Sequence, residues 1–73
     1  MEPLILAIDL GTSGPKVALV TTRGLVVDCH TGAIGLSILP GGGAEQDPAE
    51  WWASIIATTS SLLAANPGAA GRV

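Results

Sequence analysis

The feature that most constrains the fold is a short, glycine-rich link between two apolar stretches. Residues 4–9 and 16–22 are rich in aliphatic and β-branched side chains, which favours strands, and the link between them is Gly11-Thr12-Ser13-Gly14-Pro15. A link this short joins antiparallel strands, because parallel strands need a crossover of roughly a dozen residues or more. Arg23-Gly24 marks a second tight turn before residues 25–31. The sequence therefore predicts a three-stranded antiparallel meander whose first strand, apolar on both faces, is buried on both sides.

One amphipathic helix is predicted after the strands, over residues 48–65. Asp47 is placed to cap it, a proline fills the first helical position, and Glu50 completes the spacing of a capping box. Asn66-Pro67-Gly68 ends the helix, and Pro40-Gly41-Gly42-Gly43 predicts a loop before it. One apolar stripe is expected to pack on the sheet: Trp52, Ile55, Ile56, Thr59, Leu62 and Leu63.

The chain is too short to bury a large core by itself. It has 73 residues with one cysteine and one histidine, so it can form neither an internal disulfide nor a Cys/His zinc site. A single helix covers one face of a sheet, whereas the first strand requires cover on both. We therefore expect this chain to be the opening part of a larger α/β domain.

The charge pattern excludes several classes of partner. Three basic residues face six acidic ones, for a net charge of -3, and the basic residues do not cluster as nucleic-acid binding requires. The N-terminus lacks the positive region of a secretory signal, and Asp9, Lys16 and the glycine-rich link interrupt the apolar stretch well short of roughly 18 residues. We expect a soluble, cytoplasmic protein that binds neither nucleic acid nor membrane.

The link between the first two strands carries the side chains with chemistry. Asp9 ends a buried strand, where a carboxylate needs a partner such as a hydrated divalent cation. Gly11 allows a ligand to approach the backbone, Thr12 and Ser13 add hydroxyls and amides for phosphate oxygens, and Lys16 adds a positive charge. The same residues are ordinary turn formers, so a purely structural hairpin is an equal alternative on these grounds.

Other polar residues are assigned structural roles. Asp28 is expected on the wetter face of the third strand, and Cys29 is expected to be a buried core thiol. Trp51 and Trp52 are explained by packing.

Two blocks of the sequence resemble the FGGY carbohydrate kinases of the actin-like ATPase superfamily. The first phosphate motif of that family is similar to Ile5-Leu6-Ala7-Ile8-Asp9-Leu10-Gly11-Thr12-Ser13-Gly14-Pro15-Lys16-Val17. The segment that opens its first helix, as written in xylulokinases, is similar to Glu45-Gln46-Asp47-Pro48-Ala49-Glu50-Trp51-Trp52. The resemblance covers about residues 4–66 and is weakest over 34–44.

The resemblance implies an enzyme that uses ATP and Mg²⁺ to phosphorylate a hydroxyl of a sugar or polyol. It implies two ribonuclease-H-like domains with the active site between them, residues 1–73 being the N-terminal part of the first. Carried over by position, Asp9 would hold the magnesium through water, Gly11, Thr12 and Ser13 would line the phosphate turn, and Lys16 would meet the transferring phosphate. Pro15 departs from the pattern because it has no N–H for a phosphate.

The family places its catalytic base, sugar contacts and adenosine pocket downstream of Val73. No catalytic residue is therefore assigned in this chain, and the isolated chain is expected to be inactive. Two other functions stay open: an actin-like ATPase of chaperone or cytoskeletal type, and a non-catalytic docking module. The identity of the sugar and any homo-oligomer of the complete protein also stay open.

Overall fold

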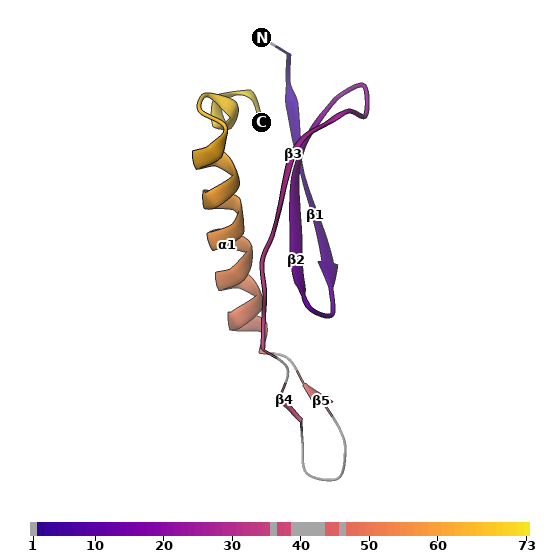
Figure 1. The fold of residues 1–73 in the computed structure, drawn as a ribbon, viewed down its shortest axis with the longest axis vertical. Helices are drawn as coiled ribbons and strands as arrows, with labels where there is room; N and C mark the ends of the chain where they lie inside the picture. The colour runs from indigo at the N-terminus through magenta and orange to yellow at the C-terminus, as the bar shows by residue number, and fades with distance from the viewer. Residues whose placement is uncertain (1, 36, 39–43, 46) are drawn as a thin grey trace.

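A three-stranded sheet with one long helix along its side forms the body of the molecule (Figure 1). The computed structural model describes residues 2–35, 37–38, 44–45 and 47–73. The sheet is antiparallel and its strands follow chain order: β1 (Leu4–Gly11), β2 (Gly14–Thr21) and β3 (Val26–Thr31). The helix is α1 (Pro48–Ala65). The predicted meander followed by one helix is confirmed.

Two smaller elements were not predicted. A second, two-stranded antiparallel ladder pairs β4 (Ser37–Ile38) with β5 (Ala44–Glu45) and projects beyond the end of the main sheet (Figure 1). A short 3-10 helix, η1 (Ala69–Arg72), follows α1. The predicted loop at 40–43 lies outside the described residues.

The caps of α1 explain where the helix begins and ends. Asp47 Oδ1 accepts a hydrogen bond from the Ala49 N–H at 2.9 Å, one residue earlier than the capping-box spacing predicts. The Glu50 N–H donates instead to the Asp47 carbonyl oxygen at 3.1 Å. At the other end, Gly68 has a φ of 86°, in the left-handed region that suits glycine, and it turns the chain into η1.

The core lies between β2 and α1, because β2 is the central strand. Its odd-numbered side chains face the helix, and Val17 and Leu19 are fully buried there against Leu62. Leu4 and Ala69 complete the buried apolar set. This small core holds the sheet against the helix.

The helix contacts the sheet with only part of the predicted stripe: Leu62 is fully buried and Leu63 packs against the core. Trp52 and Ile56 are 64% and 49% exposed, whereas Thr58 is buried. The reason lies in β3, where the chain continues through Gly32: a Cβ there would overlap Thr58 Oγ1 and lie 2.6 Å from Ser54 Oγ. A glycine facing small hydroxyl side chains allows close approach, so near Gly32 the helix packs on the sheet with Ser54 and Thr58 rather than with Trp52 and Ile56.

Three expectations about the strands are wrong. Cys29 is exposed rather than buried, and Asp28 lies on the side of β3 that faces α1. Only one face of the sheet is covered by the described residues, so Ile5 on β1 is 51% exposed and the strand is not buried on both sides. The single helix explains the difference, since it packs mainly along β2 and β3.

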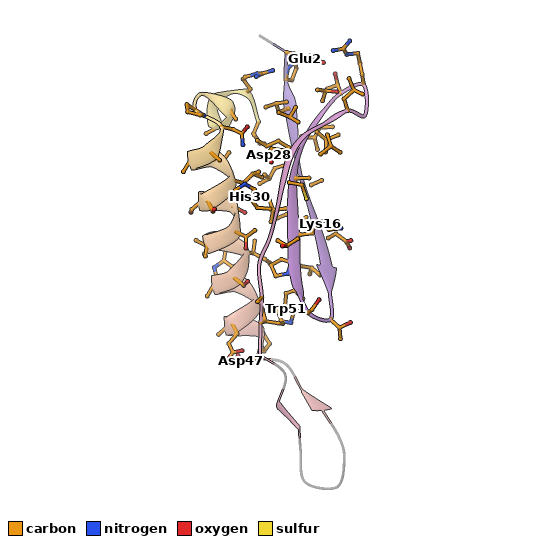
Figure 2. All side chains as sticks on the ribbon, in the orientation of Figure 1. Glu2, Lys16, Asp28, His30, Asp47 and Trp51 are labelled. Atoms are coloured by element: carbon orange, nitrogen blue, oxygen red, sulfur yellow. The ribbon has the colours of Figure 1, made fainter. Side chains whose placement is uncertain are left out.

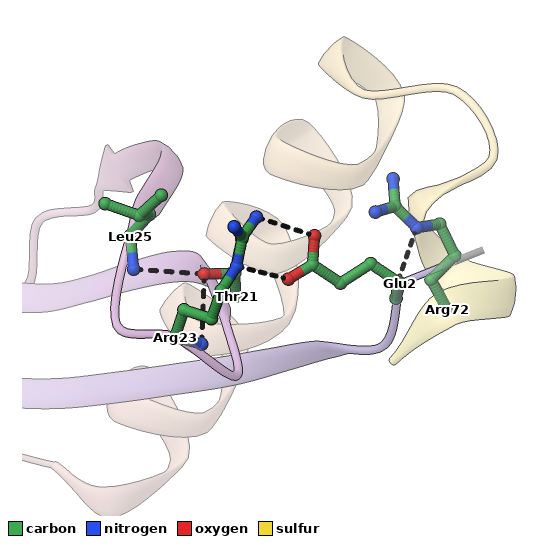
Figure 3. A network of polar contacts seen from close by, with 5 residues as sticks. All are labelled: Glu2, Thr21, Arg23, Leu25 and Arg72. Atoms are coloured by element: carbon green, nitrogen blue, oxygen red, sulfur yellow. Dashed lines mark hydrogen bonds and ion pairs between the residues drawn. The ribbon is translucent and has the colours of Figure 1, made fainter.

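A polar network ties the two ends of the chain to the β2–β3 turn (Figure 3). Two nitrogens of the Arg23 guanidinium group, Nε and Nη2, donate to the two Glu2 carboxylate oxygens at 3.2 and 3.3 Å. Arg72 Nε donates to the Glu2 carbonyl oxygen at 2.8 Å, and Thr21 Oγ1 accepts from the Leu25 N–H at 3.1 Å. The network holds η1 beside the start of β1.

Candidate functional site

The predicted site residues gather at the tip of the β1–β2 hairpin. Gly11 pairs with Gly14, so Thr12 and Ser13 form a two-residue tip. Two steps back along the strands, Asp9 lies directly opposite Lys16. The tip opens onto a pocket of about 240 Å³ whose lining includes four of the five predicted site residues, Asp9, Gly11, Ser13 and Lys16. The rest of the lining is Gly14, Pro15, Thr31 and Gly32.

Asp9 and Lys16 project from the open face of the sheet. Side chains alternate along a strand, and the neighbours of Lys16, which are Pro15 and Val17, are buried on the helix side. Lys16 therefore points away from α1, as Figure 2 shows, and its cross-strand partner Asp9 shares that face. Both side chains are exposed, so a carboxylate and an ammonium stand side by side where a solvated ligand can reach them.

The two glycines of the tip have different surroundings. A Cβ on Gly11 would meet nothing closer than the Gly14 carbonyl oxygen at 3.7 Å, so the backbone there is open to a ligand. Gly14 has a φ of 146°, and a Cβ on it would overlap the Gly32 carbonyl oxygen. Among the described residues no side-chain-bearing residue has a positive φ, so Thr12 and Ser13 do not adopt the primed turn usual in two-residue hairpins, and Gly14 absorbs the difference.

A third segment of the site was not predicted from the sequence. Residues 32–34, which we call the strap, continue from β3 and run between the hairpin tip and α1. The Gly32 N–H donates to the Pro15 carbonyl oxygen at 2.8 Å, and the Ile34 N–H donates to the Ser13 carbonyl oxygen at 3.3 Å. The sequence signal for this close approach is Gly32, a glycine within a strand-like stretch.

Pro15 fits the site as a packing residue. Its side chain is fully buried, and a Cβ on Gly32 would lie 3.3 Å from Pro15 Cγ. The proline supplies its carbonyl oxygen to the strap rather than an N–H to a ligand. Although Pro15 lines the same pocket as Asp9 and Lys16, its side chain is buried on the helix side of the sheet.

A hydrated magnesium ion suits the donors of this tip. Mg²⁺ is commonly held by one or two carboxylates together with waters and substrate phosphates, and Asp9 offers one exposed carboxylate. No cluster of three or more His, Cys, Asp or Glu side chains occurs among the described residues, so a cage made of protein ligands is not found in them. A single exposed carboxylate such as that of Asp9 suits a hydrated metal ion that arrives with phosphate groups.

A second polar cluster joins β3 to α1 farther along the strand (Figure 2). Asn66 Nδ2 donates to Asp28 Oδ2 at 2.8 Å, His30 Nε2 lies 3.5 Å from the same oxygen, and His30 Nδ1 lies 3.1 Å from Ser61 Oγ. The Asn66 hydrogen bond, followed by the Cys29 N–H and the nearby His30, holds the pKa of the Asp28 carboxyl below its ordinary value. We call this group of Asp28, His30, Ser61 and Asn66 the polar tether.

A larger hollow of about 590 Å³ lies on the other side of the strap, against α1. It shares Thr31 and Gly32 with the pocket at the hairpin tip. Its remaining lining comes mostly from the strap and from small and polar residues of the helix, including Glu50, Ser54 and Ser61. The two hollows therefore adjoin each other where β3 passes into the strap.

No helix among the described residues is both long and apolar enough to cross a membrane.

Comparison with known proteins places the chain in a family. Residues 4–68 match the FGGY family of carbohydrate kinases, N-terminal domain. The chain is 39% identical over 61 residues to a xylulose kinase from Klebsiella pneumoniae, covering 84% of this chain and 12% of that protein. It is 43% identical over 49 residues to a xylulose kinase from Escherichia coli strain K12, covering 67% of this chain and 10% of that protein. No solved structure matches it.

These matches cover most of the chain but little of the relatives. The chain spans about one eighth of the Klebsiella pneumoniae protein and one tenth of the Escherichia coli protein. The matched range includes the hairpin tip, the strap and the whole of α1. The chain therefore belongs to the FGGY family of carbohydrate kinases and corresponds to part of its N-terminal domain.

Proposed function

We propose that this chain supplies the phosphate-binding corner of an enzyme that transfers a phosphoryl group from ATP to a hydroxyl of a sugar or polyol. The observation that carries the proposal is the placement of Asp9 opposite Lys16, on the open face of the sheet and on the lining of one pocket. Family membership supports phosphoryl transfer to a carbohydrate over a structural hairpin. The names of the two relatives make xylulose the first acceptor to assay.

Each residue of the tip is expected to have its own role in binding the metal ion or the phosphates. Asp9 would hold Mg²⁺ through water, and the bound ion would neutralise charge on the phosphates. Gly11 leaves room for the phosphates, and the amides and hydroxyls of Thr12 and Ser13 are suitable donors to their oxygens. Lys16 would place its ammonium near the transferring group, where charge spreads over the phosphoryl oxygens.

The remaining machinery is assigned to protein outside these residues. A catalytic base, the sugar contacts and the adenosine pocket are expected in the rest of the N-terminal domain and in a second domain, since the relatives are far longer than the matched segment. The isolated chain is accordingly expected to be inactive. A cytoplasmic location suits an enzyme that uses ATP.

The proposal is tested with a hybrid kinase. In the hybrid, the Klebsiella pneumoniae xylulose kinase carries this chain's residues in place of the segment that matches them. We expect a hybrid that unfolds at a temperature close to that of its parent and releases ADP only when xylulose is present. A folded hybrid that releases no ADP would contradict the proposal, and ADP release without any sugar would favour the ATPase alternative.

A second measurement does not depend on the hybrid. Mg·ATP added to the 73-residue chain should shift the amide resonances of residues 11–16 more than those of residues 48–65 in NMR spectra. Equal shifts throughout, or none, would favour the docking-module alternative, in which the hairpin has no ligand.

A further inference from the structure

We propose that Ser54, on α1, is a positioning residue for the phosphate turn and acts on it through the strap. This inference rests on the proposed function and deepens it, because it assigns a role at the same site to a residue outside the binding motif. Ser54 lies on the lining of the larger hollow, not on that of the pocket at the hairpin tip. Its influence on a ligand would therefore be transmitted by the backbone.

The first step runs from the turn to the strap. Ser13 and Pro15 use their carbonyl oxygens to accept hydrogen bonds from the N–H groups of Ile34 and Gly32. These two bonds fix the peptide planes that follow Ser13 and Pro15, which include the amide of Gly14. The orientation of the turn therefore depends on where the strap lies.

The second step runs from the strap to the helix. Ser54 Oγ donates a hydrogen bond to the Ala33 carbonyl oxygen at 3.0 Å. Ala33 lies between the two strap residues that bond to the turn, so this bond holds the middle of the strap against α1. Thr58 adds packing contact at Gly32.

The hairpin tip and the strap fit closely against each other. A Cβ on Gly14 would overlap the Gly32 carbonyl oxygen and lie 2.8 Å from Ala33 Cα, so turn and strap are in close backbone contact. A displacement of Ala33 would therefore be passed to Gly14 without a flexible side chain to absorb it. Binding groups need to be held within about 0.5 Å of their productive positions, so a small shift of the strap affects phosphate binding.

The experiment compares two serines of α1 in the hybrid kinase. Ser54→Ala removes the hydrogen bond to Ala33, while Ser60→Ala makes the same substitution at an exposed position of the same helix. We expect Ser54→Ala to raise the KM for ATP by about 2- to 10-fold, the range for one hydrogen bond, with the KM for sugar unchanged. Ser60→Ala should change neither constant.

The outcomes separate this inference from the function on which it rests. A merely structural role for Ser54 would lower the unfolding temperature and the amount of active enzyme while leaving the KM for ATP as it was. That result, in an otherwise active hybrid, would overturn the positioning role alone. A folded hybrid without kinase activity would overturn both proposals.

Discussion

The strand β3 and the strap meet the same helix in two different ways. At the strap, Gly32 brings the backbone against Ser54 and Thr58, and the contact depends on the absence of a side chain. At the polar tether, the side chains of Asp28 and His30 form hydrogen bonds with those of Asn66 and Ser61, respectively. The first attachment depends on close packing of the backbone, and the second depends on hydrogen bonds between polar side chains.

The two attachments differ in how firmly they hold the geometry of the site. Backbone contact at Gly32 leaves little freedom, and it lies next to the hairpin tip with Asp9 and Lys16. The polar tether is partly exposed, with side-chain exposures of 28% for His30 and 36% for Asp28. Water can therefore replace the hydrogen-bond partners of these side chains. We therefore expect the strap to control the site and the tether to adjust stability.

The largest expected effect on stability comes from Gly32→Ala. The added methyl group would overlap Thr58 Oγ1, so the strap or the helix must move. We expect the free energy of unfolding of the hybrid kinase to fall by about 1–3 kcal/mol, the usual cost of overpacking, and the KM for ATP to rise. Denaturant unfolding and steady-state kinetics measure the two effects.

Gly35→Ala is the matched control for this substitution. A Cβ on Gly35 would lie 3.5 Å from Glu50 Oε2, which is an ordinary contact distance, so the same chemical change should alter neither quantity appreciably. If Gly35→Ala and Gly32→Ala behave alike, the proposed close approach at the strap is wrong.

A smaller, pH-dependent effect is expected at the polar tether. The fold lowers the pKa of Asp28, so its ionised form stabilises the folded state at pH values above its ordinary pKa of about 4. This stabilisation is lost as the pH falls through the lowered pKa. Asn66→Ala removes the main cause of the shift, so its loss of stability should be largest near neutral pH and should shrink in acid.

Thermal unfolding of the hybrid at several pH values measures this dependence. Asn66 also donates to the Leu62 carbonyl oxygen at 2.8 Å, and the loss of that bond should not depend on pH. The control is therefore Asn66→Ala in a background that carries Asp28→Asn, where the pH dependence should disappear. A loss of stability that is constant with pH in both backgrounds would show that Asp28 is not the group responsible.

Local signals in the sequence were sufficient for the hairpin and the helix. The glycine-rich link joins adjacent strands, and Asp47 caps the helix that follows it, so neither depends on distant residues. The predicted residues Asp9 and Lys16 were brought together for the same reason, since a short turn sets their register.

Long-range packing decided the features that the sequence did not reveal. The strap reaches the hairpin tip from another part of the chain, and its place depends on contacts of Gly32 with both β2 and α1. The same contacts rotate α1, so Thr58 is buried while Trp52 stays exposed, although hydrophobic periodicity favours the opposite. Asp28 was misplaced because alternation defines two faces of a strand but does not say which one a helix will cover.

One pair of substitutions tests whether Asp9 belongs to the phosphate-binding machinery. Asp9→Asn and Asp47→Asn make the same chemical change in the hybrid kinase, and asparagine caps a helix about as well as aspartate does. We expect Asp9→Asn to lower kcat on the order of 100- to 1,000-fold without altering the unfolding temperature, and Asp47→Asn to leave kcat unchanged. Equal kcat values for the two variants would show that Asp9 does not belong to the phosphate-binding machinery.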